Sequence, residues 1–322
     1  MFNSLFRMIL NSINGLVGNY ALAVILFTVL IKLVVLPLDI KSKKSMRAMT
    51  ALQPKIEELK AKYGKDPDKL NQKTMELYKK EKVSPTAGCL PLLIQLPILF
   101  IMFGAMRAVA NEQTIAMILN MADQVAAGVS PENVEVAFEG FLWIKNLFQP
   151  DTFTSLLPAF GDKLAMIATV DGSSILTAEN IEAARTFLAS EAYEAIAIAH
   201  GAGEFVRYPI PVLVTTLYVT IPNSIHSLLN CTNGLFILPV LAGVTQWLMT
   251  KLTGTANASA QQQGSMGFMN WFFPLFSVYI CLSYNAAFSL YWVVSNLIAM
   301  VQQYAVNKAL DMKEKKAEIE NA

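Results

Sequence analysis

Long apolar runs separated by polar segments are the main feature of this chain. Five of the runs are predicted to form membrane-spanning helices, and they cover residues 20–38, 88–109, 235–252, 268–282 and 286–305. Their lengths lie near the ~20 residues that a helix needs to cross a ~30 Å hydrocarbon core, the fourth run being short. Only three residues, 283–285, separate the last two runs, so these two are predicted to form a tight antiparallel hairpin.

The first 19 residues follow a different pattern, in which apolar residues recur at helical spacing with Asn, Ser and Arg7 between them. A cleavable signal peptide would need an unbroken apolar core and a small-residue cleavage site. We therefore expect residues 1–19 to form an amphipathic helix lying in the membrane interface.

The two long connections differ in charge, and this difference predicts the topology. Residues 39–87 hold thirteen Lys and Arg against seven Asp and Glu, whereas residues 110–234 hold four against thirteen. By the positive-inside rule, the basic segment is cytoplasmic. With five spans, the N-terminus lies outside, and the loop 253–267 and the tail 306–322 lie in the cytoplasm.

The basic segment 39–87 is predicted to form a helical hairpin that stands off the membrane. Gly64 is expected to end its first helix, Asp66 to cap its second, and Pro67 to take the first helical position. Two interpretations stay open: a solvated hairpin without a partner, or a docking arm for anionic lipid heads, a ribosome or an incoming chain.

The composition agrees with a membrane protein and does not indicate an enzyme. The chain is 54% hydrophobic and 15% charged, with a mean hydropathy of +0.43, which is too apolar for a protein surrounded by water alone. The three cysteines have neither disulfide nor metal-site spacing, and His200 and His226 have no carboxylate or cysteine cluster nearby in the sequence. No catalytic triad, phosphate loop or zinc motif is present. We expect no catalytic site, cofactor, metal or specific nucleic-acid recognition.

Lys32 is the exception inside the first apolar run, where a charge costs at least a few kcal/mol. One interpretation is snorkelling, because a lysine stem can almost reach the cytoplasmic lipid heads. Other polar residues at membrane depth favour a shared hydrated cavity instead, since unpaired amides in lipid are costly. These residues are Gln95, Gln246, Ser295 and Asn296. Tyr291 and Trp292 fit either an interface belt or the same cavity.

Several motifs, taken in order, resemble the YidC/Oxa family of membrane protein insertases. They are "LIKLVVLPLDIKSKKSMRAMTALQPKIEELKAKYG", "LYKKEKVSPTAGCLPLLIQLPILFIMFGAM", "FLWIKNLFQPD", "LFILPVLAGVTQWLMTKL" and "FMNWFFPLFSVYICLSYNAAFSLYWVVSNLIAMVQQYAVNKAL".

The resemblance implies an all-α integral membrane protein with five transmembrane helices around a hydrophilic groove that opens to the cytoplasm and to lipid. Lys32 takes the position of the family's groove cation, which is most often Arg. The expected groove residues are Lys32, Gln95, Gln246, Tyr291, Trp292, Ser295 and Asn296.

The implied function is insertion and chaperoning of nascent membrane proteins in a bacterial plasma membrane. The implied partners are those clients and membrane lipids, together with a ribosome and the Sec translocon. The rival hypothesis, a small-solute transporter or channel, should show inverted repeats, and the sequence shows none. A purely structural scaffold would leave Lys32 unexplained.

Two departures from the family pattern limit the transfer. Residues 154–233 form an insert that the family usually lacks, with a helical pattern at "AENIEAARTFLASEAYEAIAIA" and an apolar stretch at "IPVLVTTLYVTI" that is too short to span. We expect the insert to lie on the outer surface, with the apolar stretch as an interfacial segment. The final hairpin also lacks the proline usual in its turn.

Overall fold

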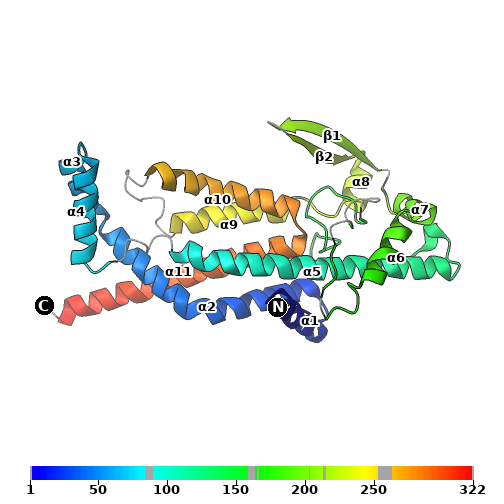
Figure 1. Ribbon diagram of the computed structural model, residues 1–322, viewed down its shortest axis with the longest axis horizontal. Helices are drawn as coiled ribbons and strands as arrows, with labels where there is room; N and C mark the ends of the chain where they lie inside the picture. Colours follow the sequence, from blue (N-terminus) through cyan, green and yellow to red (C-terminus); the bar gives the residue numbers. More distant parts are fainter. Residues whose placement is uncertain are drawn as a thin grey trace. The chain divides into compact units, whose positions relative to one another are not determined.

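The chain is mostly helical, as the sequence predicts (Figure 1). The computed structural model describes residues 2–83, 90–158, 164, 167–170, 172–202, 204–212, 215–252 and 263–320. The chain divides into two compact units. Unit 1 holds Met1–Phe27, Ile101–Val240 and Tyr279–Tyr291, and unit 2 holds Thr28–Phe100, Leu241–Val278 and Trp292–Ala322. The division falls within the five helices that contain the predicted spans.

Helix α2, Tyr20–Ala51, contains the first predicted span and continues beyond it into the basic segment. Among the described residues it is the one helix whose length and hydropathy suffice to cross a membrane. Pro37 lies inside it, as is tolerated in spanning helices when neighbours satisfy the freed backbone groups.

The other four predicted spans lie on α5 (Leu90–Ala126), α9 (Ile237–Leu252), α10 (Gln263–Ser283) and α11 (Ala286–Glu320). Ile237–Leu252 and Trp271–Ser283 are apolar but shorter than a full span. Within unit 2, α9 and α10 approach closely at Gly243, where a Cβ atom would stand 2.6 Å from the side chain of Val278. Whether these four helices cross a bilayer stays a prediction. Most of the predicted loop 253–267 lies outside the described residues.

The basic segment contains a helical hairpin of α3 (Gln53–Tyr63) and α4 (Pro67–Lys80) in unit 2. Its local signals are confirmed: Gly64 is the C-cap of α3, and the Asp66 side chain accepts from the amide of Lys69 at 3.1 Å. A small apolar core of Met49, Leu52, Ile56 and Tyr78 holds the two helices together. This burial raises the pKa of Tyr78 above its usual range.

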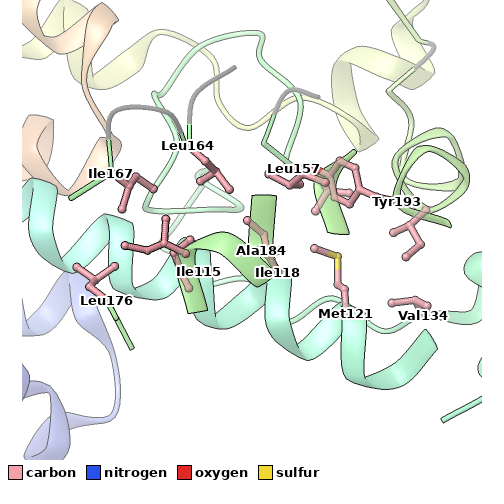
Figure 2. Packing of buried hydrophobic residues seen from close by; sticks show 13 residues of the cluster. Ile115, Ile118, Met121, Val134, Leu157, Leu164, Ile167, Leu176, Ala184 and Tyr193 are labelled. Atoms are coloured by element: carbon pink, nitrogen blue, oxygen red, sulfur yellow. The ribbon is translucent and has the colours of Figure 1, made fainter. Parts of the chain in front are cut away.

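In unit 1 the insert folds around the second half of α5. Its helices α6 (Ala178–Leu188) and α7 (Glu191–Ala199) pack with Ile115, Ile118 and Met121 of α5 in one apolar cluster (Figure 2). The sequence shows one continuous helical pattern here. The structure breaks it at residues 189–190, where the Ser190 hydroxyl caps α7 by accepting from the amide of Tyr193 at 3.2 Å.

The mostly helical fold agrees with the all-α prediction, and the apolar stretch of the insert adds one β-hairpin that the sequence did not indicate (Figure 1). Strand β1, Phe205–Val212, pairs antiparallel with β2, Thr215–Pro222, and the short helix α8, Ile225–Asn230, follows. β-Branched and aromatic residues, which favour extended structure, dominate both strands. Unit 1 also contains α1, Phe2–Val17, and a 3-10 turn at Pro131–Asn133.

Candidate functional site

The Lys32 side chain is buried in unit 2, with 8% of its surface exposed. Its ammonium group makes no hydrogen bond or ion pair with any residue that the structure describes. Its backbone carbonyl accepts a long hydrogen bond, 3.5 Å, from the side chain of Gln302 in α11. Asp39, seven residues further along α2, is the one described carboxylate that interacts with the ammonium electrostatically. A buried cation without a close counter-ion is costly for a fold and is therefore a candidate binding group.

A polar contact joins helix α11 to α9. The Asn296 amide donates to the Thr245 hydroxyl at 3.1 Å, and that hydroxyl donates in turn to the Leu241 carbonyl at 2.7 Å. Ser295 of α11 is buried, and Gln246, which follows Thr245 in α9, is half-buried. The predicted Asn296 thus has a partner in α9, but the partner is Thr245 rather than Gln246.

A groove formed by all seven predicted residues stays a prediction. Gln95 lies in α5, but its side chain is outside the described part of the chain. Tyr291 is almost fully buried in unit 1 and packs near Phe288, with ring centroids 6.1 Å apart. Trp292 is buried in unit 2. Burial of both aromatic rings differs from the exposure to lipid expected of an interface belt.

A polar contact surface between α2 and α11 was missed by sequence reasoning. The Lys43 ammonium donates to the Ala299 carbonyl at 3.1 Å, and Arg47 donates to the Asn307 carbonyl at 3.0 Å and pairs with Asp311. These cations follow the apolar run directly, so the sequence pattern shows only ordinary positive-inside residues. Their spacing, eleven residues from Lys32 to Lys43 and four more to Arg47, returns to nearly the same helix face and was the signal that could have found them.

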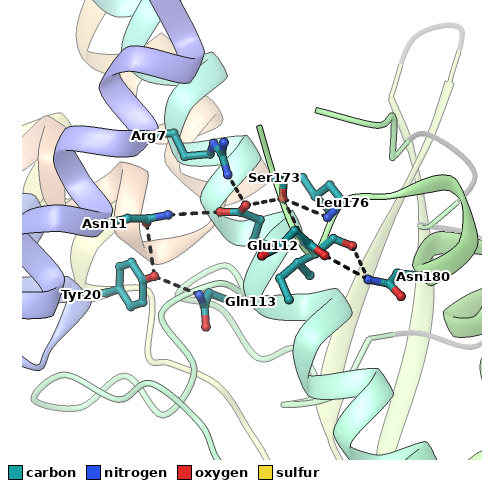
Figure 3. A network of polar contacts seen from close by, with 10 residues as sticks. Arg7, Asn11, Tyr20, Glu112, Gln113, Ser173, Leu176 and Asn180 are labelled. Atoms are coloured by element: carbon teal, nitrogen blue, oxygen red, sulfur yellow. Dashed lines mark hydrogen bonds and ion pairs between the residues drawn. The ribbon is translucent and has the colours of Figure 1, made fainter. Parts of the chain in front are cut away.

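Unit 1 contains a second polar network that the sequence did not indicate. Arg7 of α1 and Glu112 of α5 are both buried and form an ion pair (Figure 3). Glu112 also accepts from Ser173 of the insert and, at 3.3 Å, from Asn11. The interfacial helix prediction placed Arg7 on an exposed polar face, whereas the structure uses it to fasten α1 to α5.

The network includes polar residues of α5 that lie beyond its apolar run. The sequence predicted the second span to end at residue 109, because polar residues follow. Glu112 is held by Arg7, and the Gln113 amide donates to the Tyr20 hydroxyl at 2.9 Å. The helix itself continues beyond the predicted span to Ala126.

The described ranges contain no group of three or more His, Cys, Asp or Glu side chains placed to hold a metal ion. The His200 ring contacts the Ile196 carbonyl, and the His226 ring contacts Asn230, so both are engaged in contacts local to their helices.

Comparison with known proteins gives a consistent result. The chain is 29% identical over 300 residues to the membrane protein insertase YidC of Fusobacterium nucleatum, a match that covers 93% of this chain and 92% of the relative. It is 27% identical over 312 residues to the protein of that name from Chlorobaculum tepidum, covering 96% of this chain but 36% of the relative. A match to the same-named protein of Anaeromyxobacter sp. (strain Fw109-5) reaches 40% identity over 160 residues, half of this chain and 25% of the relative.

The chain thus spans nearly all of one relative and a minor part of the other two. A family model described as 60Kd inner membrane protein matches residues 12–315. Because this match extends over most of the chain and agrees with the motifs that resemble YidC/Oxa insertases, the chain belongs to the 60Kd inner membrane protein family.

Proposed function

We propose that this chain is a membrane protein insertase that helps nascent membrane proteins enter, fold and assemble in the bacterial plasma membrane. The end-to-end match to an insertase from Fusobacterium nucleatum supports this function. The family is not an enzyme family, and the mechanism involves no covalent step.

The single observation that carries the mechanism is the buried Lys32 ammonium without an ion-pair partner among the described residues. A client with acidic residues in its short outer tail supplies the missing negative charge. At an effective dielectric near 20, a Coulomb interaction at contact is worth at most about 4 kcal/mol before desolvation is subtracted. The attraction is therefore strong enough to hold a tail transiently and weak enough to release it.

The proposed path is a hydrated groove among five spanning helices, open to the cytoplasm and to lipid. Water in the groove lowers the cost of moving the polar tail part-way across the membrane. The client's apolar span then slides into lipid, and its burial supplies the driving force at about 25 cal/mol per Å² of apolar surface. The buried Ser295 and the hydrogen-bonded Asn296 support a polar wall on α11.

The finer architecture belongs to the same proposal. Residues 20–38, 88–109, 235–252, 268–282 and 286–305 span the membrane, residues 1–19 lie in the outer interface, and the hairpin within 39–87 is cytoplasmic. The ribosome and the Sec translocon are proposed partners of the basic segment 39–87. Single or paired spans with short tails are the expected clients.

The test of function is reconstitution into liposomes that hold this protein and no other. A small client synthesised outside should acquire a protease-protected fragment, while empty liposomes give none. Protection no greater than in empty liposomes would contradict the insertase proposal. A solute flux without client insertion would favour the transporter hypothesis instead.

Cysteine labelling tests the topology in a background where Cys89, Cys231 and Cys281 are replaced by serine. Lys65 in the hairpin turn and Ser174 in the insert are both exposed, so each can carry a reporter cysteine. We expect Lys65→Cys to react with an impermeant reagent only from the cytoplasmic side, and Ser174→Cys only from the outer side. Reaction of both from one side would rule out the five-span arrangement.

A further inference from the structure

One face of α2 carries three charged residues in a row. Asp39 follows Lys32 by seven residues and precedes Lys43 by four, and both spacings return to nearly the same face of a helix. All three belong to unit 2. Lys32 and Lys43 are each 8% exposed, and Asp39 is half-buried between them.

Lys43 is held in place but is not neutralised. Its ammonium donates to one main-chain carbonyl, that of Ala299, at 3.1 Å, and forms no ion pair within the described ranges. An ammonium can donate three hydrogen bonds, so two remain for another partner. Asp39 interacts electrostatically with both lysines without pairing with either, and the two positive charges oppose each other. The face therefore keeps a net positive charge.

Several uncharged polar atoms near this face are buried without a hydrogen-bond partner among the described residues. The Ser42 hydroxyl oxygen and the side-chain carbonyl oxygens of Gln302 and Gln303 are buried and have no hydrogen-bond partner in the part of the chain that the structure describes. Gln302, Gln303 and Ala299 lie on one face of α11 by their three- and four-residue spacing. Buried polar groups of this kind normally cost about 1–3 kcal/mol each when unsatisfied. Their clustering points to a polar ligand between α2 and α11.

We propose that Lys43 is a second anion-binding residue for acidic peptide tails, placed on the cytoplasmic side of Lys32 and separated from it by Asp39. This inference rests on the proposed insertase function and specifies which clients it prefers. Eleven residues of helix place the two lysines about 16 Å apart along α2. An extended peptide advances about 3.3 Å per residue. Tails with two acidic residues about five positions apart therefore engage both lysines together.

The spacing favours a peptide over an anionic lipid head. A phosphate is one compact anion, whereas the backbone positions of the two lysines lie about 16 Å apart along α2. It would also meet the Asp39 carboxylate, whereas a peptide can place a neutral residue there. The carbonyl oxygens of Gln302 and Gln303 can accept peptide N–H groups, which a phosphate head does not offer.

The experiment uses the full chain in liposomes and three clients that differ only in the outer tail. One tail carries two acidic residues five positions apart, one carries a single acidic residue, and one is neutral. The variants are Lys43→Gln, which removes the charge but can still donate to Ala299, and Lys44→Gln, an exposed neighbour used as control. Asp39→Asn is the third variant. Protease protection of each tail is measured.

We expect wild type to protect the diacidic tail about threefold to tenfold better than the monoacidic tail. Lys43→Gln should abolish that preference, Lys44→Gln should keep it, and Asp39→Asn should raise protection of the monoacidic tail. The inference would be overturned if Lys43→Gln reduced the protease protection of all three clients equally, or reduced it for none of them. An effect of Lys43→Gln that appears only with anionic lipids would also overturn it, since Lys43 would then bind lipid. If wild type inserts no client, the insertase proposal itself fails.

Discussion

Gly234 fixes the start of α9 because it leaves room for a buried carboxylate. Asp151 is fully buried in unit 1 and accepts from the amides of Leu235 at 2.8 Å and Leu238 at 2.6 Å. Leu238 lies in the first turn of α9, where backbone donors have no partner within the helix, and Leu235 lies just before the helix. A carboxylate at this end is also favoured by the helix dipole. A residue distant in sequence thus caps a predicted span.

Gly234→Ala should destabilise this joint by about 1–3 kcal/mol, as overpacking does in well-packed interiors. The added Cβ would stand 1.9 Å from Asp151 Oδ1 and 2.8 Å from its Cα atom. Gly15→Ala is the matched control, since nothing lies within 4 Å of its added Cβ and alanine favours the helix. Thermal unfolding in detergent measures both variants. Equal melting temperatures would show that Asp151 shifts without cost.

At the residue scale, the sequence made Lys32 visible because one charge interrupts an apolar run. The same reasoning could not find Lys43 or Glu112, which follow the ends of apolar runs, where polar residues are ordinary. Their burial depends on contacts with distant segments, with Ala299 for Lys43 and with Arg7 for Glu112. Hydrophobic pattern carries no information about such partners.

Tyr193 connects α7 to the loop that opens the insert. Its ring is fully buried in the apolar cluster, and its hydroxyl donates to the Pro158 carbonyl at 2.7 Å (Figure 2). Burial raises the pKa of Tyr193 above its ordinary value of about 10. The unfolded state therefore loses this proton first as pH rises, so the contribution of Tyr193 to stability is complete below about pH 10 and falls above it.

Tyr193→Phe should cost about 1 kcal/mol near neutral pH, because the Pro158 carbonyl loses its donor. Above about pH 10 the gap between wild type and variant should narrow, since phenylalanine does not ionise. Melting temperatures of both proteins across this range provide the measurement. A gap that stays constant with pH would mean that the phenol ionises as easily in the fold as in the unfolded chain.

At the element scale, capping residues predicted the α3–α4 hairpin because Gly64, Asp66 and Pro67 act locally. The β1–β2 hairpin was missed for the opposite reason. Its apolar run contains no Asn-Gly or similar turn signal, and a short apolar run does not distinguish strand from helix. The break between α6 and α7 was missed because the helical pattern continues across Ser190.

The insert is the largest feature of unit 1 that the family resemblance did not predict. Its two ends meet, because Ser155 and Thr232 form an antiparallel bridge and the Asn233 amide donates to the Thr154 carbonyl at 2.9 Å. The family motifs resume at Leu235 beyond the insert, and this alone predicts that residues 156–231 can be removed without harm to the helices. In the structure, however, removal of the insert would expose Ile115, Ile118 and Met121 of α5, which are fully buried, and this exposure would destabilise the protein.

Deletion of 156–231 with a short glycine linker should therefore give a protein that aggregates in detergent. The same deletion with Ile115, Ile118 and Met121 changed to polar residues should be monodisperse. Exposure of each apolar side chain to solvent costs about 1.5–3 kcal/mol of free energy, and the polar replacements avoid this cost. Size-exclusion chromatography compares the two. Aggregation of both would indicate that the helices of the core need the insert itself to fold.

The whole account depends on Lys32 acting as a receptor for client charge. The most direct measurement is protease protection, in reconstituted vesicles, of a client with an acidic outer tail and of the same client with that tail neutralised. Lys32→Arg should keep the protease protection of both clients. Lys32→Ala should reduce protection of the acidic client less than Lys32→Glu does. Lys32→Glu should reduce protection of the acidic client on the order of tenfold, which corresponds to about 1.4 kcal/mol, and should leave the neutral client nearly unchanged. Equal impairment of both clients by Lys32→Glu in a folded protein would show that Lys32 is a snorkelling or structural lysine.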